Sequence, residues 1–267
     1  MSQAQISAGQ VKELRDLTGA GMMTAKRALE ETGGDIDAAQ RLLREQGMAA
    51  AGKKAGRETT EGIVLSTVSG NEGVLVAIGC ETEPVSKNEE FLSFAERVLE
   101  TVESEGPDAV SGLEEQRLEL IGRIGENVEI RGAARLDAEG DELLAEYVHP
   151  PANKVGVLVR VRGGDPTLAR RIAMHISFAA PRHRTVDEVP QDEIASEREI
   201  YAQQPDVLEK PEQVREKIVE GRLRKEFLAN VALSEQTWIH DTAKTVGQAL
   251  GEAGVEVVEF VRYALAE

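Results

Sequence analysis

Apolar positions recur every three or four residues along the first part of the chain and predict three short helices. The first stripe holds Val11, Leu14 and Leu17 and ends at Gly19 and Gly21. The second lies within "MMTAKRALEETGG", and the third lies within "IDAAQRLLREQG", directly after an aspartate suited to cap a helix. Residues 48–61, "MAAAGKKAGRETTE", lack an apolar period and predict a linker. We therefore expect a three-helix domain over residues 1–47, followed by a linker over residues 48–61.

The rest of the chain repeats one layout of hairpin, helices and strand. The first copy of this layout begins with a hairpin, predicted by the apolar runs "GIVLSTV" and "GVLVAIGC" on either side of the turn "SGNE". Helical patterns follow at 88–105 and 113–124, and the segment "NVEIRGAARL" predicts a strand. In the second pass "ELLAEYVH" and "VGVLVRVRGG" predict the hairpin, "PTLARRIAMHISFAA" a helix, and "VEVVEFVRYA" the last strand. This order predicts an α+β fold with two similar subdomains, over residues 62–140 and 141–267.

An insertion over about residues 191–229 carries two long helical patterns broken at "QQPDVLEKP". Pro211 suits a first helical position, and Val214, Ile218, Leu223 and Phe227 form a loose apolar stripe. Two such helices joined by a short turn predict an antiparallel helical hairpin. Its cations, Arg222 and Lys225, are within reach of a partner, although solvated helix charge is the simpler interpretation.

Composition and charge argue against several classes of protein. The 267 residues carry a formal net charge of −17, which argues against a nucleic-acid binder because phosphate recognition needs clustered Lys and Arg. The first 57 residues hold nine Lys and Arg against seven Asp and Glu, so the remainder carries −19. No apolar stretch has the length of a membrane helix and no signal peptide begins the chain, so we expect a cytoplasmic protein. The four histidines lack paired ligand spacing, so we expect no metal and no cofactor.

The segment "CETEPVSKNEEF", residues 80–91, joins a predicted strand to a predicted helix. Its cysteine, Cys80, is the only one in the chain and ends an apolar run, a place typical of an inert core thiol. An enzyme that uses Cys80 with a histidine, or the nearby carboxylates, is the alternative reading. The chain has neither a nucleophile elbow nor a phosphate-binding glycine loop, so we do not expect enzymatic chemistry.

Five ordered blocks resemble the bacterial elongation factor Ts family. They are "VKELRDLTGAGMMTAKRALEETGGDIDAA" at 11–39, "IGENVEIR" at 124–131, "IAMHISFAAP" at 172–181, "EKIVEGRLRKEF" at 216–227 and "KTVGQAL" at 244–250. The resemblance implies an N-terminal ubiquitin-associated (UBA)-like three-helix domain, then a core of two α+β subdomains with a helical hairpin in the second. It also implies a nucleotide exchange factor for the GTPase elongation factor Tu, bound to that partner as a heterodimer or a two-plus-two complex.

The resemblance also implies which residues act. The family's Thr-Asp-Phe-Val element, which disturbs the magnesium site of the partner, matches Thr82, Glu83, Pro84 and Val85. The acid is kept, but proline replaces the aromatic residue. We expect Pro84 to act as a smaller, rigid wedge that pushes Glu83 toward an extended backbone, and Glu83 to take a larger share of the work. The alternative is that Glu-Pro is only a strand-to-helix turn.

The family's Gly-Ala-Gly-Met-Met loop, which meets a helix of the GTP-binding domain, matches Gly19, Ala20, Gly21, Met22 and Met23. The resemblance adds Arg15 and His149 as partner contacts. We expect one of the two methionines to lie in the core of the three-helix domain. His149 is expected to be either a partner contact or a turn residue, and His175 to be a packed histidine. An adaptor that binds a partner through the three-helix domain, without effect on nucleotide, remains open from that domain alone.

Overall fold

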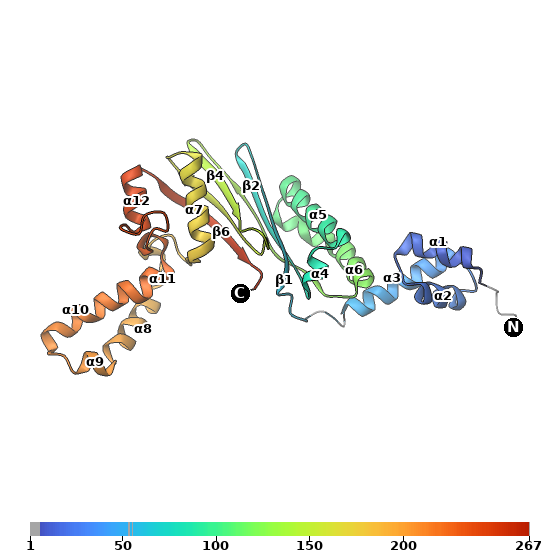
Figure 1. The fold of residues 1–267 in the computed structure, drawn as a ribbon, viewed down its shortest axis with the longest axis horizontal. Coiled ribbons are helices and arrows are strands. Elements are labelled where there is room, and N and C mark those ends of the chain that lie inside the picture. Colours follow the sequence, from blue (N-terminus) through green and yellow to red (C-terminus); the bar gives the residue numbers. More distant parts are fainter. Residues whose placement is uncertain (1–5, 53, 55, 267) are drawn as a thin grey trace. The chain divides into compact units, whose positions relative to one another are not determined.

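The computed structural model describes residues 6–52, 54 and 56–266. Helices and strands are mixed, as Figure 1 shows, which confirms the predicted α+β class. The described residues form two three-stranded sheets, with strand orders β1-β2-β3 and β4-β5-β6. By their internal contacts the residues divide into two units: the first unit holds 1–65, 76–133 and 264–267, and the second unit holds 66–75 and 134–263.

Three helices open the first unit: α1 (Ala8–Thr18), α2 (Met22–Glu31) and α3 (Ile36–Gly52). Ser7 and Gln10 form a capping box at the start of α1, and Asp35 caps α3 by accepting the backbone N–H of Ala38 at 2.9 Å. Both caps satisfy backbone donors that a helix cannot satisfy itself. Helix α3 continues to Gly52, so the first part of the predicted linker is helical.

A small core holds these three helices together. Val11, Leu14 and Leu29 pack there with three alanines on α2 and α3. Alanines at the contacts let the helices approach closely, but they bury little apolar area. Leu17, which continues the predicted stripe of α1, is 56% exposed. It lies at the end of the helix, where the chain turns away at Gly19 in a left-handed conformation.

The first sheet is accompanied by helices of differing polarity. Along the chain they are β1 (Glu61–Ser69), β2 (Glu72–Cys80), α4 (Glu83–Ser86), α5 (Glu89–Glu105), the 3-10 helix η1 (Pro107–Leu113), α6 (Glu114–Ile124) and β3 (Val128–Asp137). Nearly every residue of β2 is buried, which explains its unbroken apolar run. Asn88 caps α5 by accepting two backbone N–H groups, and the phenylalanines at 91 and 94 begin its buried stripe.

The second sheet carries helix α7 on one face (Figure 1). Its strands are β4 (Glu142–Val148), β5 (Val155–Arg162) and β6 (Glu256–Ala264), and the helices beside them are α7 (Pro166–Ala179) and α12 (Val246–Ala253). β4 and β5 pair antiparallel, with Glu142 opposite Arg162 and Val148 opposite Gly156. Val157, Val159, Ile172 and Ile176 are fully buried in the core between sheet and helix.

The insertion forms a helical hairpin with a hydrophobic core of its own. It comprises α8 (Gln191–Ala202), α9 (Pro205–Leu208), α10 (Glu212–Arg222), the π-helix η3 (Leu223–Leu228) and α11 (Ala229–Val231). Pro211 precedes α10 as its N-cap, one residue earlier than predicted, because its ψ of 137° is not helical. Of the predicted stripe, Val214 is exposed, whereas Leu223 is buried.

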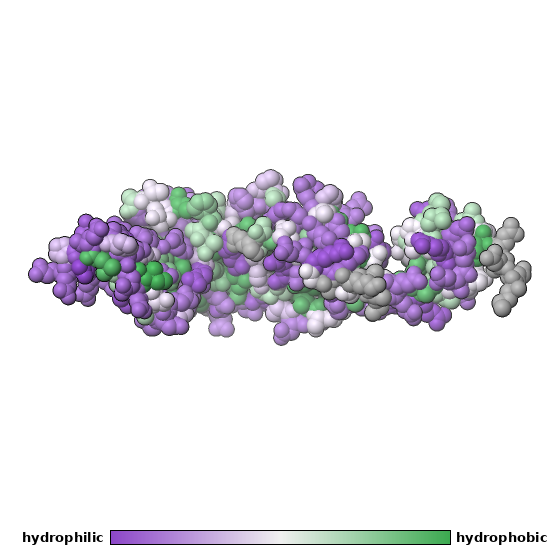
Figure 2. All heavy atoms as spheres, turned by 90° about the horizontal axis from the view of Figure 1, so that it is seen from below, coloured by the Kyte–Doolittle hydropathy of each residue, from purple (hydrophilic) through white to green (hydrophobic). Residues whose placement is uncertain are grey.

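The visible surface is mainly polar. On the face shown in Figure 2 hydrophilic residues predominate, and hydrophobic ones form small separate groups. Within the described part of the chain, none of the helices is both long and apolar enough to span a membrane.

Candidate functional site

The predicted tip, residues Thr82, Glu83, Pro84 and Val85, stands between β2 and α5 and begins with an extended residue. Thr82 has φ −131° and ψ 151°, and its carbonyl accepts the backbone N–H of Val85 at 3.1 Å and of Ser86 at 3.3 Å. These bonds turn the next four residues into the short helix α4. The expectation that Pro84 holds Glu83 extended is therefore wrong: Glu83 is the first helical residue, and Pro84 takes the next position, where its missing N–H costs no helix bond.

Thr82 is fixed by a carboxylate from a distant part of the chain. Glu126, between α6 and β3, accepts the backbone N–H of Thr82 at 3.0 Å and its hydroxyl at 2.7 Å. The thiol of Cys80 donates to the carbonyl of Thr82 at 3.3 Å. Cys80 itself is fully buried, which confirms the core reading of this thiol.

A second bond runs the opposite way across the same joint. Glu81 accepts the backbone N–H of Asn127 at 2.6 Å and pairs with Arg57 at 3.4 Å. The side-chain amide of Asn127 donates to the carbonyl of Arg57 at 2.9 Å. Arg57 belongs to the predicted linker, so this hydrogen bond also connects the linker to the base of the tip. Sequence reasoning did not find Glu81, Glu126 or Asn127. The signal for Glu126 and Asn127 was present in the block "IGENVEIR", where these two polar residues stand between an apolar helix end and a strand.

The outer part of the tip faces solvent. Glu83 and Pro84 are exposed, and α4 contains no buried residue. The carboxylate of Glu83 pairs with Lys87 at 2.7 Å, one helical turn further along. That hydrogen bond raises the pKa of Lys87. The tip therefore presents a carboxylate and a rigid ring on an exposed turn whose base is bonded to Glu126.

The loop between α1 and α2 is the second predicted contact. Gly19 has a φ of 66° and Gly21 is the N-cap of α2, so both glycines shape the turn. Met22 and Met23 are 60% and 62% exposed, so the expectation that one of them is core is wrong. The core positions of α2 are Ala25, Ala28 and Leu29 instead, because they alone face the other two helices.

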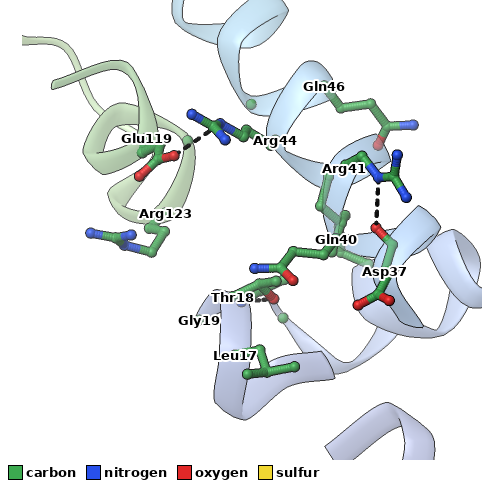
Figure 3. Close-up of a pocket in the computed structure, with 16 residues that line it drawn as sticks. Leu17, Thr18, Gly19, Asp37, Gln40, Arg41, Arg44, Gln46, Glu119 and Arg123 are labelled. Carbon is green, nitrogen blue, oxygen red and sulfur yellow. Dashed lines mark hydrogen bonds and ion pairs between the residues drawn. The ribbon is translucent and has the colours of Figure 1, made fainter. Parts of the chain in front are cut away.

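A hollow of about 800 Å³ adjoins this loop, between α3 and α6 (Figure 3). Arg44 on α3 pairs with Glu119 at 3.0 Å and also with Glu115. A side chain on Gly122 would reach within 3.1 Å of the Cα of Gly47, so glycines allow the two helices to cross closely. The labelled side chains mix both charges, and the hollow offers no single ligand chemistry.

His149, the third predicted contact, belongs to the second unit and lies in a turn after β4. Its backbone N–H donates to Val155 at 2.9 Å, and its carbonyl accepts from Asn153 at 3.1 Å. The hydroxyl of Tyr147 lies 3.0 Å from Nδ1 of His149, and the guanidinium of Arg170 lies 5.7 Å from the centre of the Tyr147 ring. His149 is thus a turn residue whose ring orientation is fixed by a neighbour, which is compatible with either predicted role.

His175 is a packed histidine, as predicted, with no exposed area. Its Nε2 lies 3.0 Å from Oε1 of Gln236, and its Nδ1 accepts the backbone N–H of Ile239 at 3.4 Å. Because Nδ1 accepts, the neutral ring carries its proton on Nε2 and donates it to Gln236. The described residues contain no group of three or more His, Cys, Asp or Glu side chains that could hold a metal ion.

Acid is expected to destabilise the protein through His175. Burial lowers the pKa of its imidazole, although the bond to Gln236 opposes this effect. The unfolded chain takes up this proton near pH 6.5 and the folded chain does not. The free energy of unfolding should therefore fall as pH drops through that value, by at most about 1.4 kcal/mol per pH unit from this group.

Urea unfolding at several values between about pH 5 and pH 8 measures this dependence. The variant His175→Asn removes the titrating group and should show a flatter dependence than the parent. Equal slopes in the two proteins would contradict the assignment.

The comparisons with known proteins agree on one family. The model of the family described as elongation factor Ts matches residues 81–267. Elongation factor Ts of Thioalkalivibrio sulfidiphilus is 45% identical over 274 aligned residues, which cover 98% of this chain and 92% of that protein. Those of Alkalilimnicola ehrlichii and Yersinia pestis are 40% and 42% identical, again with 98% of this chain and 92% of the relative covered.

These matches place the protein among the factors of translation elongation. Within that class the chain belongs to the elongation factor Ts family, which confirms the resemblance carried by its five sequence blocks.

Proposed function

We propose that this protein is a nucleotide exchange factor for the GTPase elongation factor Tu and that its tip, Thr82–Val85, promotes the release of GDP. Membership of the elongation factor Ts family supports the partner. The observation that carries the mechanism is the tip itself, an exposed carboxylate and proline on a helical turn fixed at its base by Glu126.

The chemistry of the tip fits this role. A GTPase holds GDP through its phosphates and a Mg²⁺ ion, whose positive charge offsets the phosphate charge. A carboxylate and a wedge that press on this site would weaken the hold on the ion and hence on the nucleotide. By linkage, a factor that weakens nucleotide binding is itself weakened by nucleotide, so incoming GTP expels it. No covalent step is required, and the protein would not act as an enzyme in that sense.

The α1–α2 loop would supply a second contact. Three large apolar side chains are exposed around it: Leu17, Met22 and Met23. Methionine adapts to irregular apolar surfaces, which suits a contact with a helix of the GTP-binding domain. Arg15, Gly19, Ala20 and Gly21 complete this proposed surface, and His149 is proposed as a separate contact from the second unit.

The finer architecture is also part of the proposal. We infer a UBA-like domain over residues 1–47 and two related subdomains over 62–140 and 141–267, with the hairpin inserted in the second. The order of helices and strands supports this division. The partner complex is proposed as a heterodimer or a two-plus-two assembly in the cytoplasm, where a translation factor meets its GTPase.

Stopped-flow release of a fluorescent GDP from elongation factor Tu tests the proposal. Addition of this protein should accelerate release, and the acceleration should be smaller at high Mg²⁺ because added ion opposes its loss from the site. Binding of the two proteins without faster release would favour the adaptor alternative and overturn the exchange function.

A further inference from the structure

We propose that Glu126 is a positioning residue for nucleotide exchange, which sets the direction in which the tip leaves the end of β2. This inference rests on the proposed function of the tip. Glu126 lies 44 residues from Thr82 in the sequence, and neither the family comparison nor the sequence analysis assigns it a role.

The hydrogen bonds of Thr82 differ from those of an ordinary N-cap threonine. A threonine at an N-cap normally accepts a backbone N–H of the helix with its hydroxyl oxygen. Thr82 occupies the N-cap of α4, yet no such bond is present. Its hydroxyl instead donates to Glu126, and its backbone N–H donates to the other oxygen of the same carboxylate. The local cap is thus replaced by a bidentate bond to a distant residue.

A reciprocal hydrogen bond from Glu81 also holds the base of the tip. Glu126 reaches Thr82 while Glu81, the residue before Thr82, reaches the backbone of Asn127, the residue after Glu126. A single contact would let the tip pivot about one point. Two adjacent pairs of residues, bonded in opposite directions, resist rotation as well as separation.

The shallow packing of α4 supports the same role, because Val85 and Ser86 are only half-buried and Glu83 and Pro84 are exposed. The helix has four residues and buries none of them, and so short a helix does not persist by itself. Hydrogen bonds at its root therefore decide where Glu83 and Pro84 point. Because exposed bonds add little to global stability, loss of Glu126 should misdirect the tip while the body stays folded. Errors in placement of about 1 Å can lower a rate by up to about a hundredfold.

The test compares Glu126→Ala with a matched control, Glu129→Ala. Glu129 also accepts a threonine hydroxyl, that of Thr59, at 2.9 Å, but Thr59 is not part of the tip. GDP release from elongation factor Tu is measured over a range of exchange-factor concentrations. We expect Glu126→Ala to lower the maximal rate roughly tenfold and to change the half-saturating concentration less than about twofold. Glu129→Ala should leave the maximal rate unchanged.

Two further variants separate positioning from stability. Glu126→Gln keeps one acceptor oxygen and should recover part of the rate. Thr82→Val removes the hydroxyl bond but keeps the backbone N–H bond to Glu126, so it should lose less than Glu126→Ala. The double variant should lose no more than Glu126→Ala alone, because Glu126→Ala already removes both bonds. Unfolding curves identify any variant that fails to fold. In a folded Glu126 variant, Glu126→Ala or Glu126→Gln, the backbone amide of Thr82 should exchange its hydrogen faster than in the parent.

The outcomes distinguish this inference from the proposed function. If Glu83→Ala slows release and Glu126→Ala does not, the tip acts but Glu126 does not position it. If the parent accelerates release but neither Glu83→Ala nor Pro84→Ala alters it, the proposed role of the tip fails and the positioning role of Glu126 fails with it, whereas the exchange function stands. Unchanged hydrogen exchange at Thr82 in both Glu126 variants would also overturn the positioning role.

Discussion

Replacement of Glu83 by alanine is expected to slow stimulated GDP release roughly ten- to a hundredfold, because a charge-assisted contact in the complex is worth about 1.5–3 kcal/mol. The stability of the free protein should not change, since Glu83 is exposed and its pair with Lys87 is a surface ion pair. Stopped-flow release with the parent and the variant, with a thermal melt of each, measures both quantities.

Two neighbouring variants serve as controls for this result. Lys87→Ala removes the ion pair between Lys87 and Glu83 in the unbound protein and should leave release unchanged or faster. Pro84→Phe restores the larger wedge of the family, and the structure tolerates it, because Pro84 is exposed in the first turn of α4. An unchanged rate for Glu83→Ala would remove that carboxylate from the mechanism.

Replacement of Gly62 by alanine is expected to lower the free energy of unfolding by about 3 kcal/mol or more. Gly62 lies in β1 with a φ of 135°, a conformation that other residues rarely adopt. A methyl group there would meet the backbone oxygen of Ile78 on β2 at 2.0 Å, so the strands would have to separate. Urea unfolding of the variant measures the loss.

Two other glycines show which part of that loss comes from the clash. Gly70→Ala imposes only an unfavourable φ of 62°, with no neighbour in the way, and should cost about 1 kcal/mol. Gly112→Ala meets nothing and has no positive φ, so it should be nearly neutral. Similar losses for Gly62→Ala and Gly70→Ala would show that β1 and β2 can yield.

The elements that sequence reasoning found are those in which one local pattern decides the structure. The apolar run of β2 and the turn before it predicted a hairpin, and Asp35 before an apolar stripe predicted the start of α3. The period of the apolar positions could not show at which residue of a helix burial ends. Leu17 and Met22 continue apolar patterns, yet both are exposed, because they flank the α1–α2 loop outside the small core that the three helices share.

The candidate site was predicted only in part, for a physical reason. Resemblance placed Thr82–Val85, and the local turn explains why Pro84 is accepted there. Glu126 acts on Thr82 through a bond that joins residues 44 positions apart, and no periodicity in one chain encodes such a pairing. The error over Glu83 has a local origin instead. The carbonyl of Thr82 accepts the backbone N–H groups of Val85 and Ser86, which begins a helix one residue earlier than the proline rule allows for.

The helical hairpin has its own hydrophobic core, formed by residues from Val189 to Ala232 that include Tyr201, Val219 and Leu223. Local opening needs only that one core to be lost, so its free energy can be well below that of global unfolding. A protease could therefore nick the hairpin while the sheets and the tip remain intact. The same separation means that a change in the length of α8 or α10 would leave the core beneath α7 intact.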